Sequence, residues 1–167
     1  ALCVWLVLLI ATFIVNDGFL WSRTFRRLSG LIVLTLTWWM LGWLRTQWYG
    51  AWWVLGFLCI IWLADIGAYF VGRSFGKHKL APSISPGKTI EGVFGGLLLV
   101  AMVSMVVHLI VQHYFSVLPV VWLLLSTLLV ALVSVGGDLY ESRLKRLEAI
   151  KDSGNILPGH GGILDRI

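Results

Sequence analysis

Long apolar stretches constrain the fold of this chain more than any other feature of its sequence. They cover residues 2–15, 29–44, 50–72, 92–111 and 117–136. A membrane-spanning helix needs about 20 apolar residues, so the last three stretches qualify as they stand. The first looks truncated, and the second needs residues from its flanks. Hydrophobic residues make up 59% of the chain and charged residues 13%, which excludes an ordinary soluble domain. We predict an all-α, polytopic membrane helical bundle in one domain, 1–167.

The basic residues predict how this bundle is oriented. If the five apolar stretches cross the membrane alternately, every Lys and Arg except Arg45 falls on the same side. Positively charged loops stay in the cytoplasm, so we expect cytoplasmic loops and a cytoplasmic C-terminal helix and loop. Tryptophans gather near Arg45 on the opposite side, as in an interfacial belt. They are Trp38, Trp39, Trp43, Trp48, Trp52 and Trp53.

The chain changes from apolar to charged and glycine-rich at Asp138. If Asp138 opens a helix, polar side chains at i, i+3, i+4, i+7 and i+8 share one face. These are Asp138, Glu141, Ser142, Lys145 and Arg146. Glycine-rich residues 153–162 follow, and then Asp165. Glycine loops let backbone N–H groups approach an anion, and two aspartates can hold a divalent cation. The pattern indicates a metal–phosphate site; a solvated amphipathic tail with ordinary helical ion pairs is the alternative.

The segment 72–92 contains a second candidate phosphate site, Ser85-Pro86-Gly87-Lys88-Thr89. It is similar to the end of a P-loop, but the first glycine is missing and no strand is predicted before it, which excludes an ATPase P-loop. A Gly-Lys-Thr sequence entering a helix still offers N–H groups, an ammonium and a hydroxyl to a phosphate. Asp65 lies in the third apolar stretch, where a carboxylate usually faces a polar interior. A hydrated position near the helix end is the alternative for Asp65.

The histidines divide into three kinds. His160 lies between glycines and is a candidate site residue. His78 is either a phosphate neighbour or one more residue of a basic loop. His108 and His113, near the outer end of the fourth stretch, are predicted to be structural or interfacial. No Cys/His spacing indicates a zinc site.

The C-terminal polar stretch closely resembles the signature of the phosphatidate cytidylyltransferases, also called CDP-diacylglycerol synthases. The resemblance is carried by Ser142-Arg143-Leu144-Lys145-Arg146, Lys151-Asp152-Ser153-Gly154 and Leu157-Pro158-Gly159-His160-Gly161-Gly162-Ile163-Leu164-Asp165-Arg166. Residues 65–69 and 84–92 are similar to other stretches of the same family. The resemblance implies that phosphatidic acid attacks the α-phosphorus of CTP, giving CDP-diacylglycerol and pyrophosphate.

The resemblance also implies roles for individual residues. Asp138 and Asp165 would bind Mg²⁺, with a second cation such as K⁺ shared between them. Ser142 and Lys145 would complete the catalytic set. The candidate substrate-binding residues are Asp65, Ser85, Lys88, Thr89, Lys151, His160 and Arg166.

The expected partners are CTP, phosphatidic acid and the lipid bilayer, without nucleic acid, and a homodimer is left open. We expect the site to face the cytoplasm at the bacterial inner membrane. Family members are commonly longer, so the chain is predicted to be truncated at both ends. Two other functions stay open: a transporter or cation channel, and an inactive paralogue of the enzyme. Ion flux without CTP consumption would favour the first, and intact folding without turnover the second.

Overall fold

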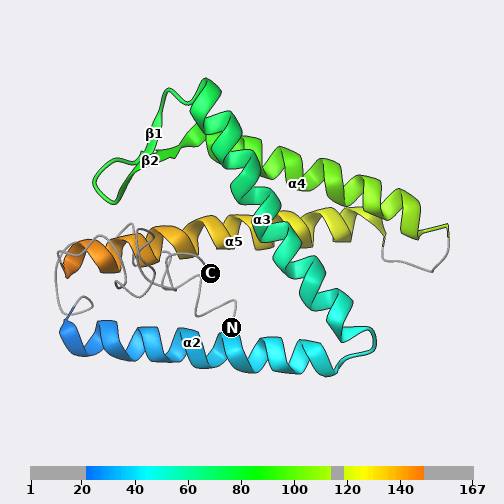
Figure 1. The fold of residues 1–167 in the computed structure, drawn as a ribbon, viewed down its shortest axis with the longest axis horizontal. Coiled ribbons are helices and arrows are strands. Elements are labelled where there is room, and N and C mark those ends of the chain that lie inside the picture. The colour runs from blue at the N-terminus through cyan, green and yellow to red at the C-terminus, as the bar shows by residue number, and fades with distance from the viewer. Residues whose placement is uncertain (1–21, 114–118, 149–167) are drawn as a thin grey trace, which may run out of the picture.

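The computed structural model describes residues 22–113 and 119–148, which form four long helices and one small sheet (Figure 1). The elements are α2 (Arg23–Thr46), α3 (Gly50–Phe75), β1 (Lys79–Ala81), β2 (Ser85–Thr89), α4 (Ile90–Val111) and α5 (Val120–Leu147). All four helices are long and apolar enough to cross a membrane. The predicted all-α membrane bundle is therefore confirmed. The apolar stretch 2–15 lies outside the described residues.

The second apolar stretch does borrow from both flanks, because α2 runs from Arg23 to Thr46. The supposition that Asp138 opens a helix does not hold, although the five polar residues that it grouped do lie on one helix, α5 (Val120–Leu147). Asp138 lies well inside α5, which continues through Gly136 and Gly137 to Leu147. Gly136, Leu139 and Tyr140 are buried around this point, so tertiary packing overrides the low helix propensity of the glycine pair.

The interface between α3 and α4 is the most extensive one between the described elements. Small residues line it: Ala64 and Gly67 of α3, and Gly92, Gly95 and Gly96 of α4, are all buried. A Cβ atom built at Gly96 would lie 2.5 Å from the carbonyl oxygen of Ala64. The two backbones therefore approach as closely as glycine permits, which is how membrane helices gain packing energy.

The helix α5 completes the core and is tied to α2. Ala131 of α5 packs with Ala64 and Val100 in a buried apolar cluster. Near the end of α5, the hydroxyl groups of Tyr140 and Ser29 share a hydrogen bond of 2.6 Å, and both residues are buried. The start of α2 is thus fixed beside the end of α5.

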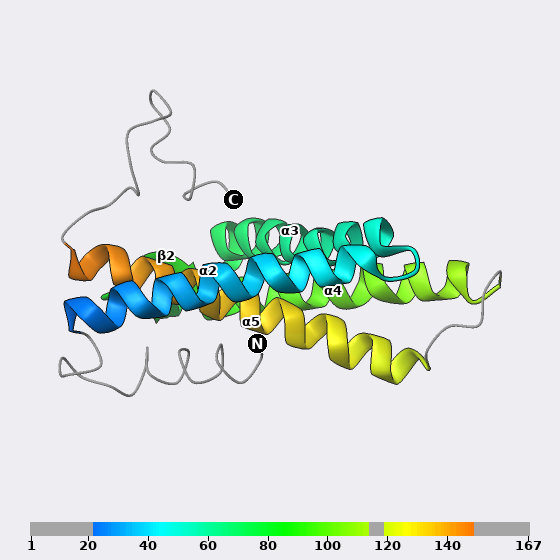
Figure 2. The same cartoon turned by 90° about the horizontal axis from the view of Figure 1, so that it is seen from below.

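Both views place the start of α2, the end of α3, the sheet, the start of α4 and the end of α5 at one end of the molecule (Figures 1 and 2). We call this the polar end. It contains the described basic residues of the hairpin and of the last turns of α5, whereas Arg45 lies at the opposite end. At 28 residues, α5 is about 42 Å long against a hydrocarbon core of about 30 Å. Its last turns therefore reach the membrane surface.

The small sheet is an antiparallel hairpin that the sequence did not predict. Lys79 pairs with Thr89 and Ala81 with Ser85, with an irregularity between the two pairs. The segment Ser85–Thr89, expected to lead into a helix, does so as strand β2, and α4 follows at Ile90. Pro86 is tolerated because a two-stranded sheet consists of edge strands. The hairpin places Lys88 next to α5, where it meets Asp138. This contact between β2 and α5 forms the candidate functional site.

Candidate functional site

Lys88 and Asp138 meet at the polar end, although they are far apart in the sequence. The ammonium of Lys88 forms an ion pair with Oδ2 of Asp138 and donates a hydrogen bond of 3.3 Å to the carbonyl oxygen of Val135. The Lys88 side chain is 23% exposed and that of Asp138 is 50% exposed. An ion pair this exposed adds little stability to the fold, so it matters mainly because of the residues that it brings together. It brings β2 and α5 to a common point where solvent and solutes have access.

Asp65 of α3 is the third charged residue at this point. Its carboxylate lies within electrostatic range of both others, repelled by Asp138 and attracted by Lys88. Three elements therefore contribute to what we call the charged cluster: Asp65, Lys88 and Asp138. With two carboxylates and one ammonium, the cluster is net negative and favours an additional cation.

The next turns of α5 carry the other predicted catalytic residues. The Lys145 ammonium lies 3.3 Å from Oε1 of Glu141, the i,i+4 pair that the alternative interpretation expected. Ser142 is half-buried, one helical turn beyond Asp138. Nε of Arg146 donates a hydrogen bond of 3.4 Å to the carbonyl oxygen of Ile84 in the hairpin turn. The bond from Arg146 to Ile84 holds the end of α5 against the hairpin.

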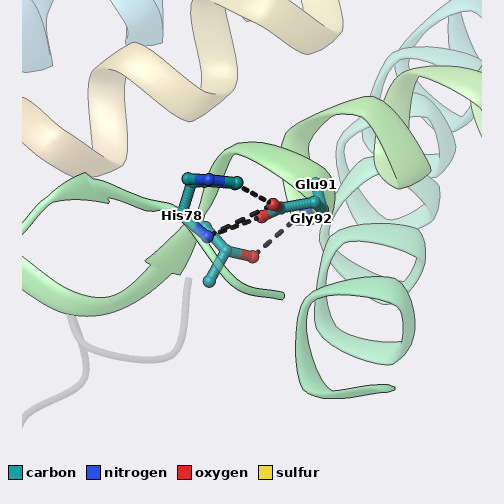
Figure 3. Close-up of polar contacts among 4 residues, drawn as sticks. His78, Glu91 and Gly92 are labelled. Carbon is teal, nitrogen blue, oxygen red and sulfur yellow. Dashed lines mark hydrogen bonds and ion pairs between the residues drawn. The ribbon is translucent and has the colours of Figure 1, made fainter. Parts of the chain in front are cut away.

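The hairpin is anchored to α4 by His78 and Glu91, a pair that the sequence interpretation missed (Figure 3). Nδ1 of His78 lies 2.6 Å from Oε1 of Glu91, and the backbone N–H of His78 donates to both carboxylate oxygens at 3.2 Å. The N–H of Ile90 donates back to the carbonyl of His78 at 2.9 Å. His78 is thus engaged in holding the hairpin. The sequence offered one signal for this contact. Glu91 lies in the first turn of a helix, where a carboxylate is favourable.

Thr89, a predicted substrate-binding residue, is 5% exposed and caps α4. Its Oγ1 accepts a hydrogen bond of 3.1 Å from the N–H of Gly92. The side chain packs closely against Gly72 and Gly76 at the end of α3. Ser85 is half-buried at the other end of β2. Substrate contacts of Ser85 and Thr89 stay predictions, and the described role of the Thr89 hydroxyl is capping.

The capping role leads to a direct test. Thr89→Ala should lower the free energy of unfolding by about 1 kcal/mol, because the N–H of Gly92 loses its acceptor. Thr89→Ser, which keeps the hydroxyl, should recover most of that loss. The melting temperature in detergent, followed by circular dichroism, measures both. Equal stability of the alanine and serine variants would contradict the capping role.

The remaining predicted site residues, Lys151, His160, Asp165 and Arg166, lie outside the described residues. Within residues 22–113 and 119–148, no group of three or more His, Cys, Asp and Glu side chains could hold a metal ion. The charged cluster nevertheless offers two carboxylates. Such hard oxygen donors fit Mg²⁺, which is usually bound by one or two carboxylates, water and substrate phosphates.

The fold and the charged cluster define a polytopic membrane protein with a polar site at one membrane face. The sequence profile of the cytidylyltransferase family matches residues 1–167, and the chain belongs to this family.

Relatives in this family match the chain closely. The phosphatidate cytidylyltransferase of Bacillus subtilis (strain 168) is 49% identical over 118 residues, 71% of this chain and 43% of that protein. That of Staphylococcus epidermidis is 53% identical over 108 residues, 64% of this chain and 40% of that protein. That of Pseudomonas aeruginosa is 44% identical over 161 residues, 95% of this chain and 58% of that protein. The chain spans about half the length of these relatives.

Proposed function

We propose that this chain carries the catalytic centre of a phosphatidate cytidylyltransferase, which makes CDP-diacylglycerol from CTP and phosphatidic acid. The charged cluster is the observation that carries this proposal. It gathers side chains from α3, β2 and α5 at the polar end, where a lipid head group and a water-soluble nucleotide can meet. The names of the relatives add support for these substrates.

The chemistry suits such a cluster. A phosphate oxygen of phosphatidic acid forms a bond to the α-phosphorus of CTP, and the bond from that phosphorus to the bridging oxygen breaks. Pyrophosphate leaves with the electron pair of the broken bond. The attacking phosphate is already ionised near neutral pH, so a general base is not required. The protein must position two anions and neutralise their charge, as in phosphoryl transfer generally.

The charged residues divide this task between them. Asp138, with Asp65 nearby and Asp165 as a further predicted ligand, would hold Mg²⁺. When bound, Mg²⁺ supplies positive charge to the phosphate oxygens. Lys88 is the described cation best placed to bind a phosphate oxygen of the nucleotide. Roles for Ser142, Lys145, Lys151, His160 and Arg166, a second cation such as K⁺, and dimerisation stay predictions.

The test is the reaction itself. Purified protein in liposomes that contain phosphatidic acid should convert CTP into CDP-diacylglycerol and release one pyrophosphate for each lipid formed. We expect EDTA to stop the reaction and added Mg²⁺ to restore it. A folded protein without turnover would support the inactive paralogue. Ion flux through the liposomes without CTP consumption would support the transporter or channel.

We further propose that the polar end faces the cytoplasm, since its basic residues follow the positive-inside rule. Single cysteines at Lys77 and Gln47, in a background with Cys3 and Cys59 replaced by alanine, test this directly. A membrane-impermeant maleimide added to intact cells should label Gln47→Cys, in the turn between α2 and α3, and spare Lys77→Cys. Labelling of Lys77→Cys in intact cells would reverse the orientation.

A further inference from the structure

The two acceptors of the Lys88 ammonium are atoms that a metal ion would also choose. One is a carboxylate oxygen of Asp138 and the other is the peptide carbonyl oxygen of Val135. Hard divalent cations take carboxylate and carbonyl oxygens as ligands. At 23% exposure the ammonium has lost much of its hydration, so these oxygens replace water. Lys88 therefore binds Asp138 as a tethered cation.

The Lys88 ammonium and a divalent cation cannot both bind the Asp138 carboxylate at full strength. Their like charges repel strongly at contact distance, and the donors of Lys88 occupy lone pairs that the metal would use. The attraction of Lys88 to Asp65 strengthens its hold on this position. The lysine stem is flexible, so the ammonium can move while β2 stays in place.

We propose that Lys88 competes with the divalent cation for Asp138 and, when displaced, becomes the ligand of a nucleotide phosphate. This inference rests on the proposed function, because it needs a cation and a nucleotide at the same cluster. Because of this competition, the divalent cation and the nucleotide bind cooperatively. The cation releases the ammonium that the phosphate requires, and the phosphate gives the ammonium a new partner away from Asp138. Lys88 thus couples binding of the metal ion to binding of CTP.

The experiment measures Mn²⁺ binding by the loss of the free Mn²⁺ electron paramagnetic resonance signal, with purified protein in detergent. Phosphatidic acid is left out, so turnover cannot occur. Lys88→Met removes the charge and keeps the apolar stem. Lys79→Met is the matched control, since it removes the same charge from the neighbouring strand and leaves the ion pair with Asp138 in place. Lys88→Arg keeps the charge.

Without CTP, Lys88→Met should bind Mn²⁺ about threefold to tenfold more tightly than wild type, the range expected for removing a partly exposed competing charge. Lys79→Met and Lys88→Arg should stay close to wild type. Saturating CTP should tighten Mn²⁺ binding more in wild type than in Lys88→Met. Chelation of Mn²⁺ by CTP in solution is equal in all samples, so it cancels from this comparison.

Two outcomes would overturn the inference in different ways. If Asp138→Asn weakens Mn²⁺ binding but Lys88→Met binds no more tightly than Lys79→Met, the competition is refuted while the metal role of Asp138 stands. If Asp138→Asn binds Mn²⁺ as wild type does, both the metal role and the competition fail, and the liposome assay decides the reaction separately. Gel filtration and melting temperature verify folding, and Lys88→Gln replaces Lys88→Met if the latter does not fold.

Discussion

Asp138→Ala should lower the rate of CDP-diacylglycerol formation by about 10²- to 10³-fold at saturating CTP and Mg²⁺. Asp138 is the carboxylate through which α5 contacts Lys88, and it is a proposed ligand of Mg²⁺. Its removal takes away the charge that holds the metal and the partner that positions the ammonium. The initial rate of transfer of radiolabelled CMP from CTP into lipid measures the effect.

Glu141→Ala is the matched control for this prediction. It removes the same charge from the same helix, one turn further on, but Glu141 is paired with Lys145. Its rate should stay within about threefold of wild type, because a partly exposed i,i+4 pair contributes little. Asp138→Asn, which keeps the size of the side chain, should be as slow as Asp138→Ala. If Glu141→Ala loses as much activity as Asp138→Ala, general electrostatics of the polar end would explain both, and the specific role of Asp138 would fail.

The helices could be predicted from sequence because the requirement for them is simple. In lipid every backbone N–H and C=O group must be paired internally, so a long apolar stretch becomes a helix whatever its propensity. Side-chain packing, by contrast, determines where a helix ends. The helix α5 continues to Leu147, beyond the end of the apolar stretch, because Leu139 and Tyr140 pack into the bundle and carry the helix through the glycine pair.

The hairpin could not be predicted in the same way. Three residues form β1, and β2 contains Pro86 and Gly87, which have low strand propensity. The strands exist because tertiary contacts fix both ends, with His78 bonded to Glu91 and Arg146 bonded to Ile84. Such anchors depend on residues distant in the sequence and have no local periodic signal.

The sequence could predict which residues belong to the candidate site, but not which of them contact each other. Alternating spans place Lys88 and Asp138 on one side of the membrane, and the resemblance pointed to both. Their direct contact depends on how far the hairpin leans toward α5, which only the packing determines. Asp65 was chosen because a carboxylate in an apolar stretch is costly. The attraction of Lys88 offsets part of that cost, whereas the repulsion from Asp138 adds to it.

Gly96→Ala should lower the free energy of unfolding by about 3 kcal/mol, at the upper end for an overpacked core. The added Cβ would lie 2.5 Å from the carbonyl oxygen, 3.3 Å from the carbonyl carbon and 3.4 Å from the Cα of Ala64. All three are main-chain atoms, so rotation of a side chain cannot relieve the clash. The helices α3 and α4 must separate, and the melting temperature in detergent should fall accordingly.

The matched control is Gly56→Ala, in the same pair of helices. No atom lies within 4 Å of a Cβ built at Gly56, so this substitution should leave stability unchanged or raise it slightly, because alanine favours a helix over glycine. Separation of α3 from α4 should also slow turnover, since α3 carries Asp65 and Lys88 lies two residues before the start of α4. Gly96→Ala with the stability of Gly56→Ala would show that α3 and α4 do not pack backbone to backbone, and the geometry that brings Asp65 to Lys88 would then lose its support.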